Sequence, residues 1–170
     1  TRVAGNDPTE KTIGIVGLGT IGKKVAKRAA GFDMRILAYD VYKDEAWAAA
    51  NGVTYVPLAD LLASADYVTL HTPLLPSTRN LINAERLSMM KPTAFIINTS
   101  RGGVIDETAL GEALKGGRLA GAALDVFEHE PPWGSPLLDL PNVLVAPHVA
   151  GNSVEAQQKV IAIACENALR

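Results

Sequence analysis

Short apolar runs alternate along the chain with stretches whose apolar residues recur every three or four positions. The apolar runs predict strands at Thr12–Val16, Met34–Tyr39, Thr54–Val56, Tyr67–Leu70, Ala94–Asn98, Gly121–Asp125 and Val143–Ala146. The intervening stretches predict helices at Ile21–Gly31, Asp44–Ala50, Leu58–Ala65, Ala84–Met90 and Glu107–Lys115, and a long final helix that begins at Ser153. Regular alternation of strands and helices indicates an α/β fold.

Two of the predicted strands are apolar at every position instead of alternating between apolar and polar residues. They contain Ile13-Gly14-Ile15-Val16 and Ala94-Phe95-Ile96-Ile97. A parallel strand that is covered by helices on both faces requires such a continuous run. The sequence therefore predicts a doubly wound, mainly parallel sheet.

The composition is that of an ordinary globular protein. The 170 residues are 48% hydrophobic and 20% charged, with a formal net charge of −2, so the charge gives no reason to expect nucleic acid as a partner. No apolar stretch is long enough for a membrane span, and no signal peptide opens the chain. The single cysteine, Cys165, indicates a reducing, cytoplasmic location, and its apolar helix predicts a buried side chain.

A glycine-rich turn follows the first predicted strand and opens the first helix. Gly17, Gly19 and Gly22 have the spacing in which the first glycine permits a tight turn, the second admits a pyrophosphate and the third allows close helix packing. Asp40 ends the second strand, where a carboxylate binds both ribose hydroxyls and repels a 2′-phosphate. No arginine follows Asp40. The motif therefore predicts a Rossmann-type domain that binds NAD in preference to NADP.

Polar residues that suit the reduction of a keto acid follow later strands. Arg101, Asp125 and His148 come at or just after the ends of three strands, so they are expected at the same edge as the glycine turn, with Glu130 on a nearby loop. A histidine can supply the proton that the new alkoxide needs, and a carboxylate can hold its ring in one tautomer. An arginine can bind the substrate carboxylate through its planar fork. Asp125 is better placed for the nicotinamide end of the cofactor.

The remaining histidines carry weaker indications. Thr72 and Pro73 follow the fourth strand and are expected to line the cofactor, whereas His71 is expected to be structural and His129 to lie on the loop surface. No cluster of cysteine, histidine and acidic residues has metal-ligand spacing, so no metal site is predicted.

These motifs resemble the NAD-binding domain of the D-isomer-specific 2-hydroxyacid dehydrogenases. The matching stretches are Gly14–Gly22, His71–Leu74, Asn98–Asp106, Leu124–Pro131, Pro141–Val143 and Pro147–Gly151, which together spread across nearly all of residues 12–151. Within the family, His71–Thr78 and Glu130-Pro131-Pro132 look most like the phosphoglycerate dehydrogenase branch.

The resemblance implies a complete set of functional residues and partners. Arg101, Glu130 and His148 match the catalytic arginine, glutamate and histidine of the family. Together with the glycine turn, the expected NAD-binding set is Gly17, Gly19, Thr20, Ile21, Gly22, Asp40, Thr72, Pro73, Thr99, Ser100, Arg101, Asp125, His148, Ala150 and Gly151. The implied substrate is a small 2-hydroxy or 2-keto acid, and the full-length protein is expected to be a homodimer.

The sequence differs from the family pattern in the number of domains that it is expected to form. Family members carry a second, substrate-binding domain built from both chain ends, whereas residues 1–170 are expected to form a single dinucleotide-binding domain with its core at 12–151 and a terminal helix at 153–170. We therefore expect the chain to bind NADH but to turn over slowly or not at all, because nothing closes over the nicotinamide.

Two other functions are compatible with parts of the sequence. The first is an NADH-sensing interaction module, which would resemble the transcriptional corepressors that share this fold and keep the same arginine, glutamate and histidine. The second is a Rossmann methyltransferase, which fits poorly because Arg101, Glu130 and His148 would then have no purpose.

Overall fold

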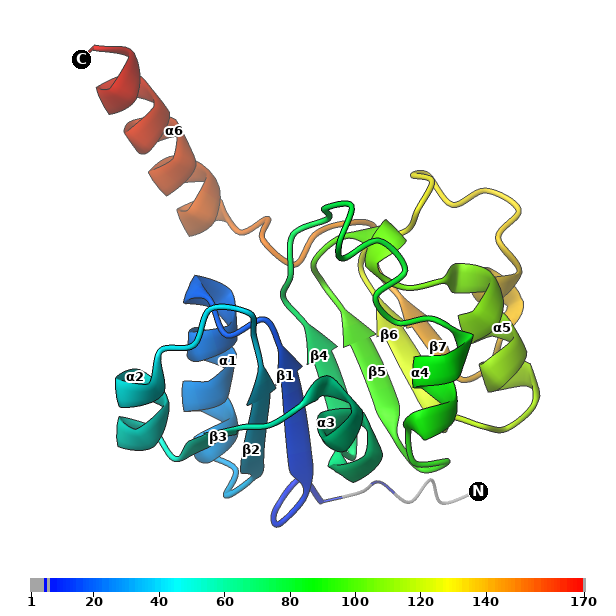
Figure 1. Ribbon diagram of the computed structural model, residues 1–170. Helices are drawn as coiled ribbons and strands as arrows, with labels where there is room; N and C mark the ends of the chain where they lie inside the picture. The colour runs from blue at the N-terminus through cyan, green and yellow to red at the C-terminus, as the bar shows by residue number, and fades with distance from the viewer. Residues whose placement is uncertain (1–4, 6, 170) are drawn as a thin grey trace.

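The computed structural model describes residues 5 and 7–169 and contains one seven-stranded sheet (Figure 1). The strands are β1 Thr12–Val16, β2 Arg35–Tyr39, β3 Val53–Tyr55, β4 Tyr67–Leu70, β5 Phe95–Asn98, β6 Gly121–Leu124 and β7 Val143–Val145. The α-helices are α1 Thr20–Ala30, α2 Glu45–Ala50, α3 Leu58–Ser64, α4 Ala84–Met89, α5 Glu107–Lys115 and α6 Val154–Ala168, and two 3₁₀ helices are η1 Gly102–Val104 and η2 Pro136–Asp139.

The strands pair in the order β3-β2-β1-β4-β5-β6-β7, and every pair is parallel. The chain winds outward in one direction from β1 to β3 and then returns to the centre and winds outward through β4 to β7. Parallel strands end at the same edge, and the change of winding direction between β1 and β4 leaves a crevice there. The predicted doubly wound sheet is confirmed.

Two hydrophobic clusters lie on opposite faces of the sheet. In β2, Leu37 belongs to the cluster beneath α3, α4 and α5, whereas its neighbours Ile36 and Ala38 belong to the cluster beneath α1. Figure 1 shows α3 and α4 in front of the sheet. Because successive side chains of a strand point to opposite faces, burial on both faces explains why these strands are apolar at every position.

The sequence placed most elements within a residue or two of their observed bounds. β3 begins and ends one residue earlier than expected, and β2 begins at Arg35 instead of Met34. The 3₁₀ helices η1 and η2 were not predicted. Each is a single short turn, so it has too few residues to show a periodic apolar pattern.

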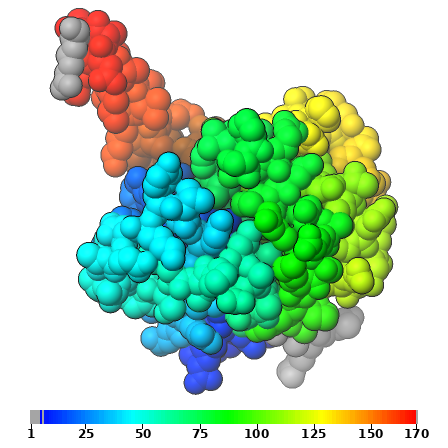
Figure 2. All heavy atoms as spheres, in the orientation of Figure 1, coloured from blue at the N-terminus to red at the C-terminus, as the bar shows by residue number. Residues whose placement is uncertain are grey.

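Helix α6 stands clear of the rest of the molecule (Figures 1 and 2). None of its residues is buried, and Cys165 is exposed, so the expected burial of this cysteine is wrong. The apolar pattern of α6 marks a face suited to packing, but the pattern cannot say whether the domain supplies a surface for it. Among the described residues, no helix is long and apolar enough to cross a membrane.

Candidate functional site

In the glycine turn between β1 and α1, close contacts require two of the glycines, and the third faces open space. Gly17 has φ +95°, and a Cβ there would lie 2.8 Å from the carbonyl carbon and oxygen of His71. A Cβ at Gly22 would overlap the carbonyl oxygen of Gly17, so only glycine lets α1 start this close to the strand. A Cβ at Gly19 would meet nothing within 4 Å. The backbone at Gly19 therefore faces open space at the amino end of a helix, which suits an anion.

The carboxylate of Asp40 is fixed against this turn. Its Oδ2 accepts a hydrogen bond from the backbone N–H of Leu18 at 2.7 Å, and its Oδ1 accepts one from Tyr42 at 3.0 Å. Asp40 is half-buried just beyond the end of β2. The Asp40 carboxylate therefore lies beside the open space at Gly19. With the phosphates of a dinucleotide in that space, the attached ribose would lie next to Asp40.

Two adjoining hollows continue from the glycine turn along the carboxyl edge of the sheet. The first, of about 340 Å³, is lined by Ile21, His71, Thr72, Pro73, Leu74, Thr99, Ser100 and Arg101. The second, of about 230 Å³, shares Thr99 and includes Asp125, Val149 and Ala150 in its lining. The hydroxyl of Thr72, which lines the first hollow, is buried without a hydrogen-bond partner in the described part of the chain. A buried hydroxyl without a partner and an open backbone cradle fit the long polar body of a dinucleotide.

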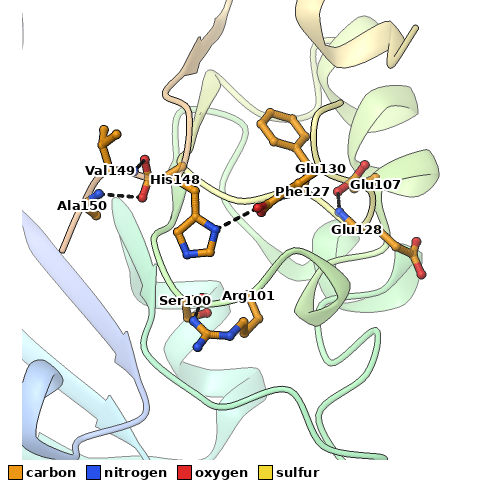
Figure 3. Close-up of polar contacts among 10 residues, drawn as sticks. Ser100, Arg101, Glu107, Phe127, Glu128, Glu130, His148, Val149 and Ala150 are labelled. Atoms are coloured by element: carbon orange, nitrogen blue, oxygen red, sulfur yellow. Dashed lines mark hydrogen bonds and ion pairs between the residues drawn. The ribbon is translucent and has the colours of Figure 1, made fainter. Parts of the chain in front are cut away.

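His148 and Glu130 form a close pair (Figure 3). Nδ1 of His148 lies 2.8 Å from Oε2 of Glu130, and Oε1 of Glu130 accepts a hydrogen bond from the backbone N–H of Phe127 at 3.1 Å. The hydrogen bond with His148 holds the pKa of Glu130 below its ordinary value, assisted by the bond from Phe127. An ionised carboxylate only accepts, so Nδ1 carries a hydrogen and Nε2 is left to exchange a proton.

Asp125 fixes the backbone turn that presents His148. Asp125 is 5% exposed, and its two carboxylate oxygens accept hydrogen bonds from the backbone N–H groups of Val149 and Ala150, each at 2.8 Å. Its carbonyl oxygen accepts a third bond, from the backbone N–H of His148, at 2.8 Å. His148 has φ +55°, a conformation that costs energy for a residue with a side chain. These three bonds offset that cost.

Arg101 is positioned by a polar residue at the end of β5. Asn98 is 1% exposed, donates from Nδ2 to the carbonyl oxygen of Arg101 at 2.9 Å and accepts from Ser100 through Oδ1. Gly102 then packs so closely that a Cβ there would overlap the Phe127 carbonyl group and the backbone nitrogen of Glu128. This contact brings Arg101 beside the segment that carries Glu130.

A hollow of about 310 Å³ joins the three predicted catalytic residues. Arg101, Glu130 and His148 all line it, and Figure 3 shows the imidazole of His148 with Glu130 on one side and Arg101 on another. Most of the predicted cofactor residues lie along the path from the glycine turn to this hollow, while Gly151 lies beyond the lining of the two cofactor hollows.

Residues outside the predicted set also shape the site. None of the sequence motifs predicts the positioning role of Asn98, although a polar residue that ends a buried strand is a usable signal. None predicts the place of Arg79, which lines the same hollow as Arg101. His71 is bonded through Nε2 to Oγ1 of Thr69 at 3.0 Å, and burial lowers its pKa. Among the described residues, no group of three or more histidine, cysteine or acidic side chains could hold a metal ion.

Comparison with known proteins supplies the family. Residues 1–150 match the family described as "D-isomer specific 2-hydroxyacid dehydrogenase, NAD binding domain". The chain belongs to this family. The resemblance and the NAD cofactor inferred from the sequence are thereby confirmed for this NAD-binding domain.

Individual relatives show the same similarity. The domain is 51% identical over 164 residues to a glyoxylate reductase of Korarchaeum cryptofilum, covering 96% of the domain and 49% of the relative. It is 47% identical over 166 residues to a D-3-phosphoglycerate dehydrogenase of Methanocaldococcus jannaschii, covering 97% and 32%. The domain thus spans half or less of the length of these two relatives.

A solved structure shows the similarity in three dimensions. The NAD-complexed D-isomer specific 2-hydroxyacid dehydrogenase of Lactobacillus delbrueckii ssp. bulgaricus superimposes with a TM-score of 0.90 at 33% identity, covering 98% of this domain and 54% of that chain.

Removing the imidazole of His148 is expected to raise the pKa of Glu130, because Glu130 loses its hydrogen bond with that ring. In His148→Gln the pKa of Glu130 should rise toward its ordinary value of 4.5, which carbon-13 NMR titration of the carboxyl groups would measure. Because the pKa is lower in the folded state, the pair stabilises the fold above about pH 4.5, and this contribution is lost as the pH falls through the lower folded value.

Glu107 provides the internal reference for that titration. Burial raises its pKa, and it does not contact His148, so its titration should stay above 4.5 in both proteins. An unchanged Glu130 pKa in His148→Gln would show that the pair is not formed in solution.

Proposed function

We propose that this domain belongs to an oxidoreductase that transfers a hydride between NAD(H) and a 2-hydroxy or 2-keto acid. The observation that carries the proposal is the His148–Glu130 pair, at 2.8 Å, which opens onto a hollow that Arg101 also lines. That hollow lies at the same sheet edge as the cofactor cradle. The relatives named glyoxylate reductase and D-3-phosphoglycerate dehydrogenase support a small hydroxy acid as the substrate class.

Each side chain has a defined part in this proposal. NAD supplies or accepts the hydride when it is bound. His148 delivers a proton from Nε2 to the alkoxide oxygen during reduction and takes it back during oxidation. Glu130 keeps the ring oriented and stabilises its charged form. Arg101 binds the carboxylate of the acid with its planar guanidinium, which places the adjacent carbonyl between the imidazole and the cofactor.

Asp40 is the residue proposed to select NAD over NADP. Replacing it with alanine is expected to weaken NADH binding about tenfold to a hundredfold, because two charge-assisted hydrogen bonds to the ribose are lost. Asp40→Asn keeps an acceptor oxygen without the charge, so NADPH should bind this variant better than it binds the original domain. Calorimetric titration of each protein with NADH and NADPH measures both effects.

The outcome also tests the proposed cofactor site itself. If neither nucleotide binds the original domain, the glycine cradle does not work in this protein. If Asp40→Ala leaves the NADH affinity unchanged while thermal melting shows that it is folded, Asp40 does not hold the ribose.

The substrate half of the proposal is tested with oxamate, an unreactive mimic of a 2-keto acid. NMR saturation transfer should detect oxamate on the NADH complex and not on the free domain, and Arg101→Gln should remove the signal. Oxamate binding that Arg101→Gln leaves unchanged would show that Arg101 does not hold the substrate carboxylate.

A further inference from the structure

A second arginine stands in the hollow where the substrate carboxylate is expected to bind. Arg79 lines the same 310 Å³ space as Arg101, Glu130 and His148. It lies between β4 and α4, on a loop separate from the one that carries Arg101. Neither the cofactor cradle nor the proposed proton transfer uses Arg79.

The backbone holds the two arginine loops at a fixed separation. The N–H of Asn80 donates to the carbonyl oxygen of Gly103 at 2.8 Å, and the N–H of Ile82 donates to the carbonyl oxygen of Val104 at 3.0 Å. An isolated parallel bridge pairs Ile82 with Ile105. The segment just after Arg79 is therefore hydrogen-bonded to the segment just after Arg101. The two arginine side chains emerge from adjacent, rigidly connected segments.

The guanidinium of Arg79 uses only part of its hydrogen-bonding capacity. Its NH1 donates to Oε1 of Glu128 at 2.8 Å, and this is the one hydrogen bond of that guanidinium within the described part of the chain. The side chains of Arg79 and Glu128 are 54% and 39% exposed. An exposed ion pair of this kind is weak, so a better-placed anion can displace or share it at little cost.

We propose that Arg79 forms a subsite for a second anionic group of the substrate, a phosphate or carboxylate on the carbon beyond the hydroxyl-bearing one. This inference rests on the proposed function, in which Arg101 takes the first carboxylate. A guanidinium fork matches either anion, and its unpaired N–H groups supply the hydrogen bonds. Glu128 competes with the ligand for Arg79, so it sets the strength of the subsite.

Two acids that differ only in a phosphate test the subsite. D-glycerate and D-glycerate 3-phosphate are titrated into the NADH complex, in which neither can react, and dissociation constants are measured by NMR. The phosphorylated acid should bind more tightly. Arg79→Gln should weaken it about tenfold, as loss of a charge-assisted bond does, and should change D-glycerate less than about twofold. D-malate against D-lactate, measured in the same way, distinguishes a carboxylate subsite from a phosphate subsite.

Two further variants separate a local contact from a change in net charge. Arg118→Gln removes one positive charge from an exposed residue that lies just before β6, at the opposite edge of the sheet, and should leave both acids unaffected. Glu128→Gln removes the competing carboxylate and should tighten the binding of D-glycerate 3-phosphate.

Each outcome distinguishes the subsite from the function on which it rests. If the phosphate gives no advantage, or if Arg79→Gln leaves the advantage intact, the subsite is overturned while Arg101-dependent binding of D-glycerate still supports the proposed function. If oxamate and both acids bind but Arg101→Gln leaves all three affinities unchanged, the proposed function and the subsite fail together.

Discussion

Gly102→Ala is expected to lower the free energy of unfolding by about 3 kcal/mol or more, because an added methyl group has no space. The Cβ would overlap the carbonyl group of Phe127 and the backbone nitrogen of Glu128. Backbone atoms cannot rotate aside as a flexible side chain can, so the two segments must separate. These segments carry Arg101 and Glu130, and the substitution should therefore also disturb the catalytic hollow.

The adjacent glycine supplies the control for this experiment. A Cβ at Gly103 would lie 3.4 Å from the Cδ atoms of Leu74, an ordinary van der Waals distance. Gly103→Ala should thus change the unfolding free energy by less than about 1 kcal/mol in urea denaturation. Equal stabilities of the two variants would mean that the close approach at Gly102 is not maintained in solution.

The fold could be predicted because its signals are local and repeated. A strand such as β2 must be apolar on both faces, since Ile36 and Leu37 enter different clusters, and this continuous pattern is visible without any tertiary information. Once parallel strands are inferred, their carboxyl ends must share one edge. That rule alone predicts that Arg101, Asp125 and His148 lie at the same edge of the sheet as the glycine turn.

The connections within the site could not be predicted in the same way. The bond between Arg79 and Glu128 joins residues 49 positions apart, and Arg79 lies outside the motifs of the predicted chemistry. The hydrogen bonds that Asp125 accepts from Val149 and Ala150 likewise depend on where β6 and β7 end relative to one another. Sequence patterns identify which edge a side chain reaches, but its partners are set by the packing of loops.

Cys165 shows the opposite failure, in which a reliable local signal led to a wrong conclusion. The apolar run around it forms α6 as expected, yet no residue of that helix is buried. Amphipathic spacing predicts a helix and the face that is suited to packing. It does not predict which surface covers that face, because the covering surface is not encoded in the same segment.

The second large effect is expected for Gly19→Val, which should weaken NADH binding strongly while changing the stability of the fold little. Gly19 has φ −76°, and its Cβ would enter open space, so Gly19→Val should cost no more than about 1 kcal/mol of stability at this helix N-cap. The valine side chain would, however, occupy the space proposed for the pyrophosphate. NADH affinity should fall at least about a hundredfold, because the backbone N–H groups of α1 could no longer reach the phosphates.

Gly22→Ala separates this steric block from general damage to the glycine turn. Its Cβ would overlap the carbonyl oxygen of Gly17, so this variant should lose stability and NADH binding together. Thermal melting and calorimetric titration of both variants therefore give different signatures: loss of binding alone at Gly19, and loss of both properties at Gly22. If Gly19→Val remained folded and bound NADH at the original affinity, the phosphates would have to lie elsewhere. The neighbouring roles of Asp40 and Thr72 would then fail as well, because both depend on the same path of the dinucleotide along the sheet edge.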